Sequence, residues 1–483
     1  MTGAPVHILS TGVANIASVA AAIERCGRAA VVTARREDVV GAAHLVVPGV
    51  GAFGAAMARL EQLHLVEPLT ERVRSERPTL SICLGMQLLF DSSEESPGVR
   101  GLGIIPGCVT RFPRLPGLRV PQLGFNMVAL RDGATAFDSG YAYYANSYRV
   151  AGETVAPGWT VATTDYAGLF LGAVCSSTGR VVGCQFHPEL SGKWGHALIS
   201  RWLNGTAGLG RDRGPSLLSA GSLLATRVVP CLDVRDGRVV KGMNFVNLRD
   251  AGDPASLARA YEEQGADELV MLDVSATVQS RAAAAATVRA IRRAISIPLT
   301  VGGGVRSVED AGALLDAGAD KVSVNSAAVA NPGLIDELSR RFGAQCAVVA
   351  IDAASTSGTA GSRFAVFTHS GARATERDAI AWGVEAQSRG AGEILLTSIN
   401  RDGTQEGYDL PLLRAVSDAV SIPIIASGGA GEPSDLVDAI KLGRAHAVLA
   451  AGIFHDGRYS IVQVKAALAE AGLVVRQQGA QPC

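Results

Sequence analysis

Charged and aromatic side chains are scarce in this 483-residue sequence: Asp, Glu, Lys and Arg make up 18% of it, and Phe, Trp and Tyr 5%. The 44 basic and 45 acidic residues leave a net charge of −1, which gives no overall basic surface for nucleic acid. This low net charge, together with 48% hydrophobic residues, argues against an intrinsically disordered chain. Glycine is abundant, at 56 residues, without a collagen-like period. Many glycines and few aromatics indicate an α/β protein with tight loops near phosphates.

No C-x-x-C pair occurs among the eight cysteines, which are scattered along the chain. The sequence therefore predicts neither a zinc site nor a dense disulfide framework, and we expect no metal and no cofactor. Residues 1–23 contain no Lys or Arg, which argues against a signal peptide, and no uninterrupted apolar run reaches the roughly 18 residues of a membrane span. We expect a cytoplasmic protein with small-molecule substrates and with neither nucleic acid nor membrane as a partner.

A Gly-, Ser- and Pro-rich stretch, residues 204–226, contains few large apolar side chains and is typical of a linker. It predicts two domains, residues 1–203 and 226–483, joined by a linker at 204–225. In the first domain, short apolar runs alternate with helical patterns, and a β-rich region follows after residue 100. This pattern predicts a mixed, partly parallel sheet with flanking helices.

The second domain has a regular rhythm of strand candidates separated mostly by helical segments. The candidates are RVVPCLDV, DELVMLDV, PLTVGGG, KVSVNS, CAVVAIDA, EILLTSI, PIIASGG and AHAVLAAG. Eight β/α units in about 258 residues are typical of a (β/α)8 TIM barrel. An internal repeat at an offset of about 125 residues aligns Gly303 with Gly428 and Gly318 with Gly443. Because this offset is half a barrel, it predicts pseudo-twofold symmetry and two equivalent phosphate sites.

Cys83 lies in SICLGMQ, where an apolar strand ends and MQLLF begins a helix. A thiol at such an elbow is exposed, the helix N-terminus favours its thiolate, and the next backbone N–H groups can form an oxyanion hole. In VVGCQFHPEL, which reads as a strand, His187 and Glu189 alternate and so face one way. A carboxylate beside a histidine orients it as a general base, so the three residues form a candidate Cys/His/Glu triad. A cysteine at a strand end is, by itself, more often an inert core thiol.

Asp233 and Asp352 each end an apolar strand, which in a barrel is the C-terminal, catalytic face. They fall on the first and fifth strands, opposite each other, and can serve as acid and base on one substrate. The other interpretation is that each caps the helix that follows. Small-residue loops after four further strands offer backbone N–H groups to a substrate with a phosphate at each end. These loops contain Gly303, Gly304, Asn325, Ser326, Ser427, Gly428, Gly429, Ala451 and Gly452.

PGVGAFG, CLGMQLL and FHPE, in this order, resemble the triad-type class I glutamine amidotransferases, and the first half resembles the glutaminase of the imidazole glycerol phosphate synthases. The resemblance implies that Cys83 attacks glutamine to form a thioester, that His187 shuttles the proton and that Glu189 orients His187. It also implies a set of oxyanion and glutamine-binding residues: Gly49, Val50, Gly51, Leu84 and Gln87. Four residues around the glutamine pocket and the domain interface depart from the family's usual ones: Gln122, Phe125, Asn146 and Leu190.

The second half resembles the cyclase of the same synthases, through CLDVRDGRVVKG, VGGGVRS, GADKVSVN, AIDA, TSINRDGT and SGGAG. The resemblance implies that ammonia and phosphoribulosyl-formimino aminoimidazole carboxamide ribonucleotide give imidazole glycerol phosphate and aminoimidazole carboxamide ribotide, with Asp233 and Asp352 as the acid/base pair. Further residues implied near the substrate are Lys241, Asp273, Thr397, Asp402 and Gly403. An ammonia gate at the base of the barrel is implied for Arg227, Glu268, Lys321 and Glu393, which otherwise read as an ordinary salt-bridged base. Asn400 and Gly452 depart from the usual Asp and Ser.

The order of the two halves matches the fused glutaminase–cyclase enzymes and implies a bifunctional enzyme of histidine biosynthesis. We expect a monomer, because both partners lie in one chain. Two other functions remain open. One is the related isomerase, which also uses a half-repeat barrel and two Asp; the fused glutaminase and the NFVNLRDAGDP segment argue against it. The other is an ammonia-dependent cyclase with a structural or regulatory glutaminase-like domain, which the pocket departures favour and the intact triad opposes.

Overall fold

The chain divides into two compact units in the computed structural model. Eight segments are described: residues 3–10, 16–130, 139–153, 155–206, 224–243, 246–274, 280–355 and 364–477. The first unit comprises Met1–Leu118, Gln122–Leu224 and Pro482–Cys483, and the second comprises Arg119–Pro121 and Ala225–Gln481. Most of the expected linker falls on residues 207–223, which lie outside the described segments.

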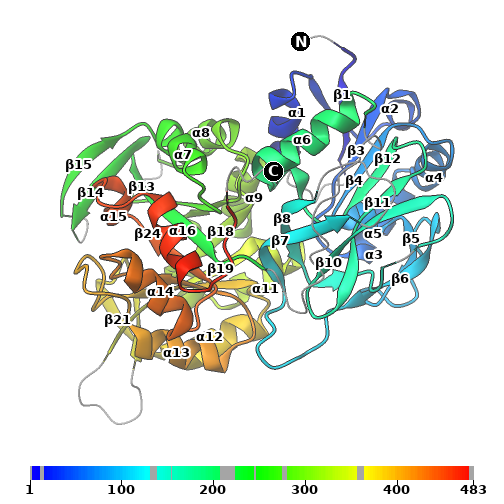
Figure 1. The fold of residues 1–483 in the computed structure, drawn as a ribbon. Helices are drawn as coiled ribbons and strands as arrows, with labels where there is room; N and C mark the ends of the chain where they lie inside the picture. Colours follow the sequence, from blue (N-terminus) through cyan, green and yellow to red (C-terminus); the bar gives the residue numbers. More distant parts are fainter. Residues whose placement is uncertain are drawn as a thin grey trace. The chain divides into compact units, whose positions relative to one another are not determined.

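A mixed sheet forms the centre of the first unit, with strand order β2-β1-β3-β4-β12-β11-β10-β7-β8 (Figure 1). The bounds are β1 Val6–Leu9, β2 Ala30–Thr33, β3 His44–Val47, β4 Thr79–Ile82, β7 Gln122–Leu130, β8 Gly140–Asn146, β10 Trp159–Asp165, β11 Leu169–Ser176 and β12 Val181–Cys184. The strands from β2 to β12 run parallel, and the rest of the sheet is antiparallel. This confirms the partly parallel sheet predicted from the sequence.

Helices pack around this sheet, and a second, small sheet joins three short strands. The helices are α1 Ile16–Arg25, α2 Arg36–Gly41, α3 Phe53–Gln62, α4 Val66–Arg74, α5 Leu84–Gln87 and α6 Gly192–Leu203, and the small sheet contains β5 Phe90–Ser93, β6 Ile105–Arg111 and β9 Tyr148–Arg149. One buried cluster unites α3 and α4 with strands of both sheets, including Phe53, Leu69 and Leu45. Amphipathic helices that turn their apolar faces to a sheet account for this arrangement.

Two local expectations near the candidate triad are wrong. The helix predicted for MQLLF ends at Gln87, because the chain turns at once into β5, which pairs with β6. The strand predicted for VVGCQFHPEL ends at Cys184, and a 3-10 helix, Pro188–Leu190, follows. Proline has no N–H to donate to a strand ladder, and it is favoured at the start of a helix. His187 and Glu189 are therefore joined by a tight turn and do not alternate along a strand.

The second unit is a closed parallel barrel (Figure 1). Within the described residues its eight strands are β13 Arg227–Arg235, β16 Leu269–Asp273, β17 Leu299–Gly302, β18 Lys321–Val324, β19 Ala347–Ser355, β22 Glu393–Ser398, β23 Ile424–Ser427 and β24 Ala447–Ala450. Each strand pairs in parallel with the next, and β24 pairs with β13 to close the barrel. All eight strand candidates are thus confirmed.

The barrel helices alternate with the strands, and the half-barrel repeat is visible in the hairpins. The helices are α7 Pro254–Glu263, α8 Ser280–Ala294, α9 Val308–Ala317, α10 Ser326–Ala330, α11 Gly333–Phe342, α12 Ala379–Ser388, α13 Leu410–Ala419, α14 Pro433–Lys441, α15 Gly452–His455 and α16 Ile461–Glu470. Strand β13 continues into a hairpin of β14 Arg238–Met243 and β15 Val246–Gly252, and β19 pairs with a hairpin of β20 Phe364–Thr368 and β21 Arg373–Asp378. The two strands that bear the candidate Asp residues are therefore elaborated in the same way.

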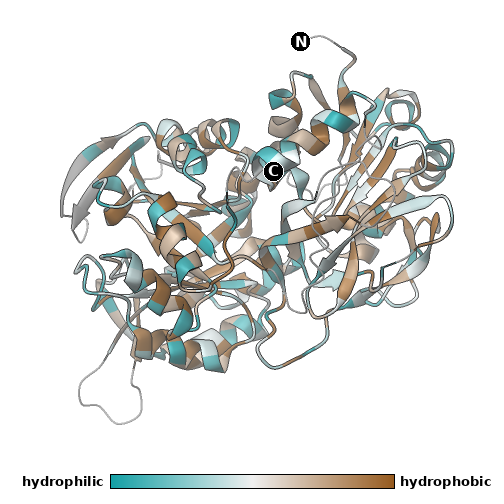
Figure 2. Cartoon of the chain, in the orientation of Figure 1, coloured by the Kyte–Doolittle hydropathy of each residue, from teal (hydrophilic) through white to brown (hydrophobic). Residues whose placement is uncertain are grey.

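Alternate residues of each barrel strand share one face, and this period places the candidate residues. Along β13, Arg227 begins the strand, Val229 and Cys231 belong to the buried interior cluster, and Asp233 follows at the C-terminal end. The cluster also takes one or two residues from each of β16, β19, β22, β23 and β24. Figure 2 shows the apolar character of the strands in both units. A polar base, an apolar interior and an acidic mouth thus succeed one another along one face of a strand.

No helix in the described part of the chain is both long and apolar enough to cross a membrane. Every cysteine in these segments is free, and Cys483 lies outside them.

Candidate active sites

The first site is centred on Cys83, which lies between β4 and α5 in a strained backbone conformation. Its φ of 51° and ψ of −108° are rare for a residue with a side chain. The Cys83 N–H donates to the carbonyl of Cys184 at 2.7 Å, which fastens the turn to the end of β12. A strand-to-helix elbow of this kind places a nucleophile above the C-terminal edge of a sheet. Cys83 is buried, however, so the expectation of an exposed thiol is wrong.

His187 and Glu189 complete a Cys/His/Glu arrangement at this elbow. His187 Nδ1 lies 2.8 Å from Glu189 Oε1, and both side chains are buried. Burial lowers the pKa of His187, but the charges of Glu189 and Cys83 outweigh it and raise that pKa well above its ordinary value. The His187 N–H donates to the carbonyl of Tyr143 at 2.8 Å, which holds the backbone of the histidine against β8. The turn after β12 therefore brings His187 and Glu189 into contact, although the strand predicted to do so is not formed.

The segment before α3 lies close enough to the elbow to require glycine. A Cβ on Gly49 would lie 2.6 Å from Leu84 Cβ, and one on Gly85 would lie 2.1 Å from the carbonyl oxygen of Val47. Gly51 adopts a φ of 94°, in the left-handed region. Leu84 is the first residue of α5, so its N–H has no acceptor within the helix. The predicted oxyanion residues Gly49 and Leu84 thus lie side by side at the elbow.

Gln87, predicted to bind glutamine, also contacts protein groups. Its Nε2 donates to the carbonyl of Tyr148 at 3.1 Å and to Oε1 of Gln185 at 3.0 Å. Gln185 is fully buried, and its own Nε2 lies 3.7 Å from Cys83 Sγ. Gln185 was not predicted from the sequence, where its only signal is its place two residues before His187. Near it, Leu190 is buried in the 3-10 helix beside Glu189.

The second site lies at the C-terminal ends of the barrel strands, where three carboxyl groups gather. Burial, and then the charge of Asp402, raises the pKa of Asp233 to about 6. Burial raises the pKa of Asp352 to about 6 as well; Asn325 opposes the shift and Asp402 adds to it. Burial also raises the pKa of Asp402, against a hydrogen bond from Gly403 N–H. Like charges in a partly dry site are a common feature of catalytic acids and bases.

Two glycine loops after β17 and β23 have matching geometry. Gly303 and Gly428 have φ values of 91° and 87°, and each lies against the backbone of the preceding strand's end. A Cβ on Gly303 would lie 2.1 Å from the carbonyl oxygen of Asp273, and one on Gly428 would lie 2.8 Å from that of Ser398. Gly304 and Gly429 follow with φ of 72° and 109°. The pseudo-twofold symmetry therefore extends to the two candidate phosphate loops.

Other predicted substrate residues end the neighbouring strands or start the next helices. Asn325, expected at a phosphate, donates from Nδ2 to Asp352 Oδ2 at 2.9 Å, and Ser326 begins α10. Thr397, Ser427 and Asp273 lie at the ends of β22, β23 and β16, while Ala451 and Gly452 lie at the start of α15. Asn400 Oδ1 accepts a hydrogen bond from Ser355 N–H at 2.8 Å. The Lys241 side chain lies outside the described part of the structure.

A closed ring of alternating charges lies at the opposite, N-terminal end of the barrel. Arg227 Nη1 is 2.8 Å from Glu268 Oε2, and Arg227 Nη2 contacts Glu393 Oε1. Lys321 Nζ bridges the same two carboxylates at 2.5 and 2.6 Å, and each of the four side chains is at most 2% exposed. Burial raises the pKa of Glu393, but Arg227 and Lys321 lower it to about 2. The four predicted gate residues are thus brought together as one ring.

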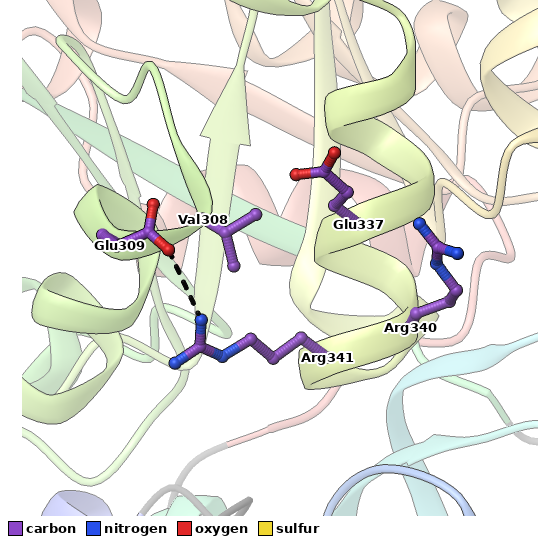
Figure 3. A pocket seen from close by; sticks show the side chains of 5 residues that line it. All are labelled: Val308, Glu309, Glu337, Arg340 and Arg341. Carbon is purple, nitrogen blue, oxygen red and sulfur yellow. Dashed lines mark ion pairs between the residues drawn. The ribbon is translucent and has the colours of Figure 1, made fainter.

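An open groove on the outer helical layer contains none of the candidate catalytic residues. Its lining is Val308, Glu309, Glu337, Arg340 and Arg341, from α9 and α11 (Figure 3). Arg341 Nη1 lies 3.7 Å from Glu309 Oε1 across it. Among the residues described, His, Cys, Asp and Glu side chains form no group of three that could hold a metal ion.

The elbow triad on a mixed sheet and the acidic mouth of a half-repeat barrel define a glutamine amidotransferase joined to a barrel enzyme. Residues 15–204 match the family described as Glutamine amidotransferase class-I, and residues 227–460 match that described as Histidine biosynthesis protein. A relative, Imidazole glycerol phosphate synthase subunit HisF of Hyphomonas neptunium (strain ATCC 15444), is 57% identical over 254 residues, which are 53% of this chain and 99% of the relative. The chain belongs to this HisF family, with an amidotransferase domain in the same polypeptide. The family and the fold predicted from the sequence are confirmed.

Proposed function

We propose that the chain hydrolyses glutamine in its first domain and uses the ammonia in its barrel. The barrel would convert phosphoribulosyl-formimino aminoimidazole carboxamide ribonucleotide into imidazole glycerol phosphate and aminoimidazole carboxamide ribotide. One observation carries the proposal: a single chain pairs the Cys83, His187 and Glu189 arrangement with a barrel mouth that holds Asp233 and Asp352. The class-I amidotransferase match supports the first reaction, and the HisF relative supports the second.

In the first reaction, Cys83 attacks the carboxamide carbon of glutamine as a thiolate. The backbone N–H of Leu84 and those of the Gly49–Gly51 segment stabilise the oxyanion. His187, whose pKa is raised by its charged neighbours, donates a proton to the leaving ammonia and then takes one from the water that hydrolyses the thioester. Glu189 holds Nδ1 of His187, so that Nε2 is the atom that exchanges protons.

In the second reaction, the two glycine loops hold the two phosphates of the substrate, so that the reacting part of the molecule lies between Asp233 and Asp352. A pKa of about 6 on each carboxyl lets either group gain or lose a proton near neutral pH, as acid and base catalysis require. Asn325 orients Asp352 through its amide hydrogen bond. Asp402 favours the protonated form of both partners through its own charge.

Ammonia that is transferred within the chain is not protonated by bulk water. This matters because ammonium has no lone pair with which to attack the substrate. The interior of the barrel between the base ring and the mouth is apolar, with Val229, Val270 and Leu395 among its members. The ring of Arg227, Glu268, Lys321 and Glu393 would act as a gate that opens when one of its ion pairs separates.

The direct experiment is Cys83→Ala, assayed for cyclisation with glutamine and, separately, with ammonium salt. The proposal predicts loss of the glutamine-dependent reaction by about 10³-fold or more and an unchanged ammonia-dependent rate. Turnover with glutamine in this variant would show that Cys83 is not the nucleophile.

The same assay on the unaltered protein distinguishes the second candidate, an ammonia-dependent cyclase with a non-catalytic amidotransferase domain. The departures at Phe125 and Leu190 favour this candidate. The ring of Phe125 packs 5.6 Å from that of Tyr143, which lies 6.4 Å from the ring of His187, and Leu190 directly follows Glu189. This candidate predicts that glutamine supports no cyclisation even with Cys83 present.

A further inference from the structure

A chain of two buried amides connects a backbone carbonyl of β9 to the sulfur of Cys83. The carbonyl oxygen of Tyr148 accepts from Gln87 Nε2 at 3.1 Å, and Gln87 Nε2 also donates to Gln185 Oε1 at 3.0 Å. Gln185 Nε2 then lies 3.7 Å from Cys83 Sγ, within hydrogen-bonding range for sulfur. Gln185 is fully buried and Gln87 is nearly so. Without these hydrogen bonds their amide groups would be buried without a partner, which is unfavourable.

The direction of this chain follows from hydrogen-bond chemistry. The carbonyl of Tyr148 can only accept, and it accepts a second amide as well, Asn146 Nδ2 at 2.9 Å. Gln87 must therefore turn its nitrogen toward Tyr148, and the second hydrogen on this nitrogen requires an acceptor on Gln185. If the Gln185 amide were reversed, two NH2 groups would face each other. Its N–H group is thus fixed toward the sulfur of Cys83.

We propose that Gln185 is a positioning residue for the nucleophile, which donates a fixed hydrogen bond to the Cys83 thiolate. The inference rests on the proposed glutaminase function. A donor on sulfur favours the charged form over the thiol, because a hydrogen bond to an ionised group is stronger than one to a neutral group. Gln87 acts through Gln185 in this scheme, since both hydrogens of its amide are already engaged.

The amide has a role distinct from that of His187. When the thiolate attacks the carboxamide carbon, the C–N bond breaks, His187 passes its proton to the departing ammonia, and Cys83 becomes a neutral thioester. When water then cleaves the thioester, the leaving group is again the thiolate, while the proton removed from water lies on His187. Gln185 cannot lose its proton, so it stabilises the negative sulfur at both stages.

The test measures the rate of Cys83 alkylation by iodoacetamide as a function of pH in the full-length chain. Mass spectrometry of the Cys83 peptide separates this thiol from the other cysteines. Gln185→Met keeps the volume and removes the donor; the midpoint of the profile should rise by about one pH unit, a roughly tenfold lower rate below the midpoint. Gln185→Asn keeps an amide but shortens it out of reach of sulfur, and it should give the same rise should the first variant fold poorly.

The matched control is Asn126→Ala. Asn126 is also fully buried in this unit, and its Nδ2 donates to the carbonyl of Asp165 at 3.0 Å. This variant loses a comparable amide bond, and its alkylation midpoint should stay at the wild-type value. Unchanged or lowered midpoints in both Gln185 variants would overturn the inference.

Failure of the proposed function has a different signature. If complete alkylation of Cys83 in the unaltered protein left glutamine hydrolysis intact, the nucleophile assignment would fall whatever the midpoints of the variants. If alkylation abolishes hydrolysis and the Gln185 midpoints do not move, only the role of Gln185 is lost.

Discussion

At the scale of single residues, the burial of two carboxyl groups at the barrel mouth, Asp233 and Asp352, lowers the stability of the folded protein. Asp233 and Asp352 are each partly buried near Asp402, and burial with like charge raises the pKa of both to about 6. A carboxyl with a raised pKa disfavours the ionised folded state, so the protein is less stable where these groups ionise. A carboxyl that titrates near neutrality is suited to proton transfer, which is the role proposed for these two groups.

Replacing Asp233 with Asn should abolish cyclisation with either nitrogen source and stabilise the fold at neutral pH. In the unfolded chain an Asp has a pKa of about 3.9, so the penalty grows between about pH 4 and about pH 6 and is constant above. The variant should gain up to about 3 kcal/mol at pH 7 and match the wild type below about pH 4. Thermal melts across this range test the sign. Retained ammonia-dependent turnover would refute the catalytic role.

At the scale of elements, the close packing of the glycine loop after β17 can be tested by adding a methyl group. Gly303→Ala places a methyl group against the carbonyl of Asp273 at a φ of 91°, so it must displace the loop. The control, Gly472→Ala, has a similar φ of 79° and open space around its Cβ, and it lies outside the candidate phosphate loops. We expect the first to raise the KM for the bis-phosphorylated substrate by at least about tenfold, and the second to lose only about 1 kcal/mol of stability. Equal KM values for the two variants would contradict this account.

The elements themselves were largely predictable, because the rules that set them are local. Apolar runs ended by small residues gave all eight barrel strands, and the repeat gave the matching loops at Gly303 and Gly428. The turn at His187 was missed, since the apolar pattern before it hid the stop imposed by Pro188. The contact between Gln87 and Gln185 was beyond prediction, because it joins residues 98 apart that carry no charge or periodic pattern.

At the scale of the whole molecule, the buried ring of Arg227, Glu268, Lys321 and Glu393 separates the N-terminal end of the barrel from its apolar interior. Removing Lys321 leaves two buried carboxylates, Glu268 and Glu393, with Arg227 as their one remaining partner in the ring, and breaking a buried ion pair costs roughly 3–5 kcal/mol. Lys321→Met should therefore destabilise the protein and, if the ring is the gate, raise the ratio of glutamine hydrolysed to imidazole product formed. Lys465→Met is the matched control, because Lys465 is a buried partner of Asp267 that belongs to no ring. An equal ratio in both variants would separate the ring from ammonia transfer.

The central claim is that one polypeptide generates ammonia from glutamine and consumes it in the barrel. The most direct measurement supplies amide-¹⁵N-labelled glutamine, the barrel substrate and an excess of unlabelled ammonium to the full chain, and reads the label in imidazole glycerol phosphate by mass spectrometry. The account predicts that the imidazole ring carries predominantly ¹⁵N, because nitrogen released at Cys83 reaches Asp233 and Asp352 without mixing with solvent. Product that carries only the unlabelled isotope would contradict it.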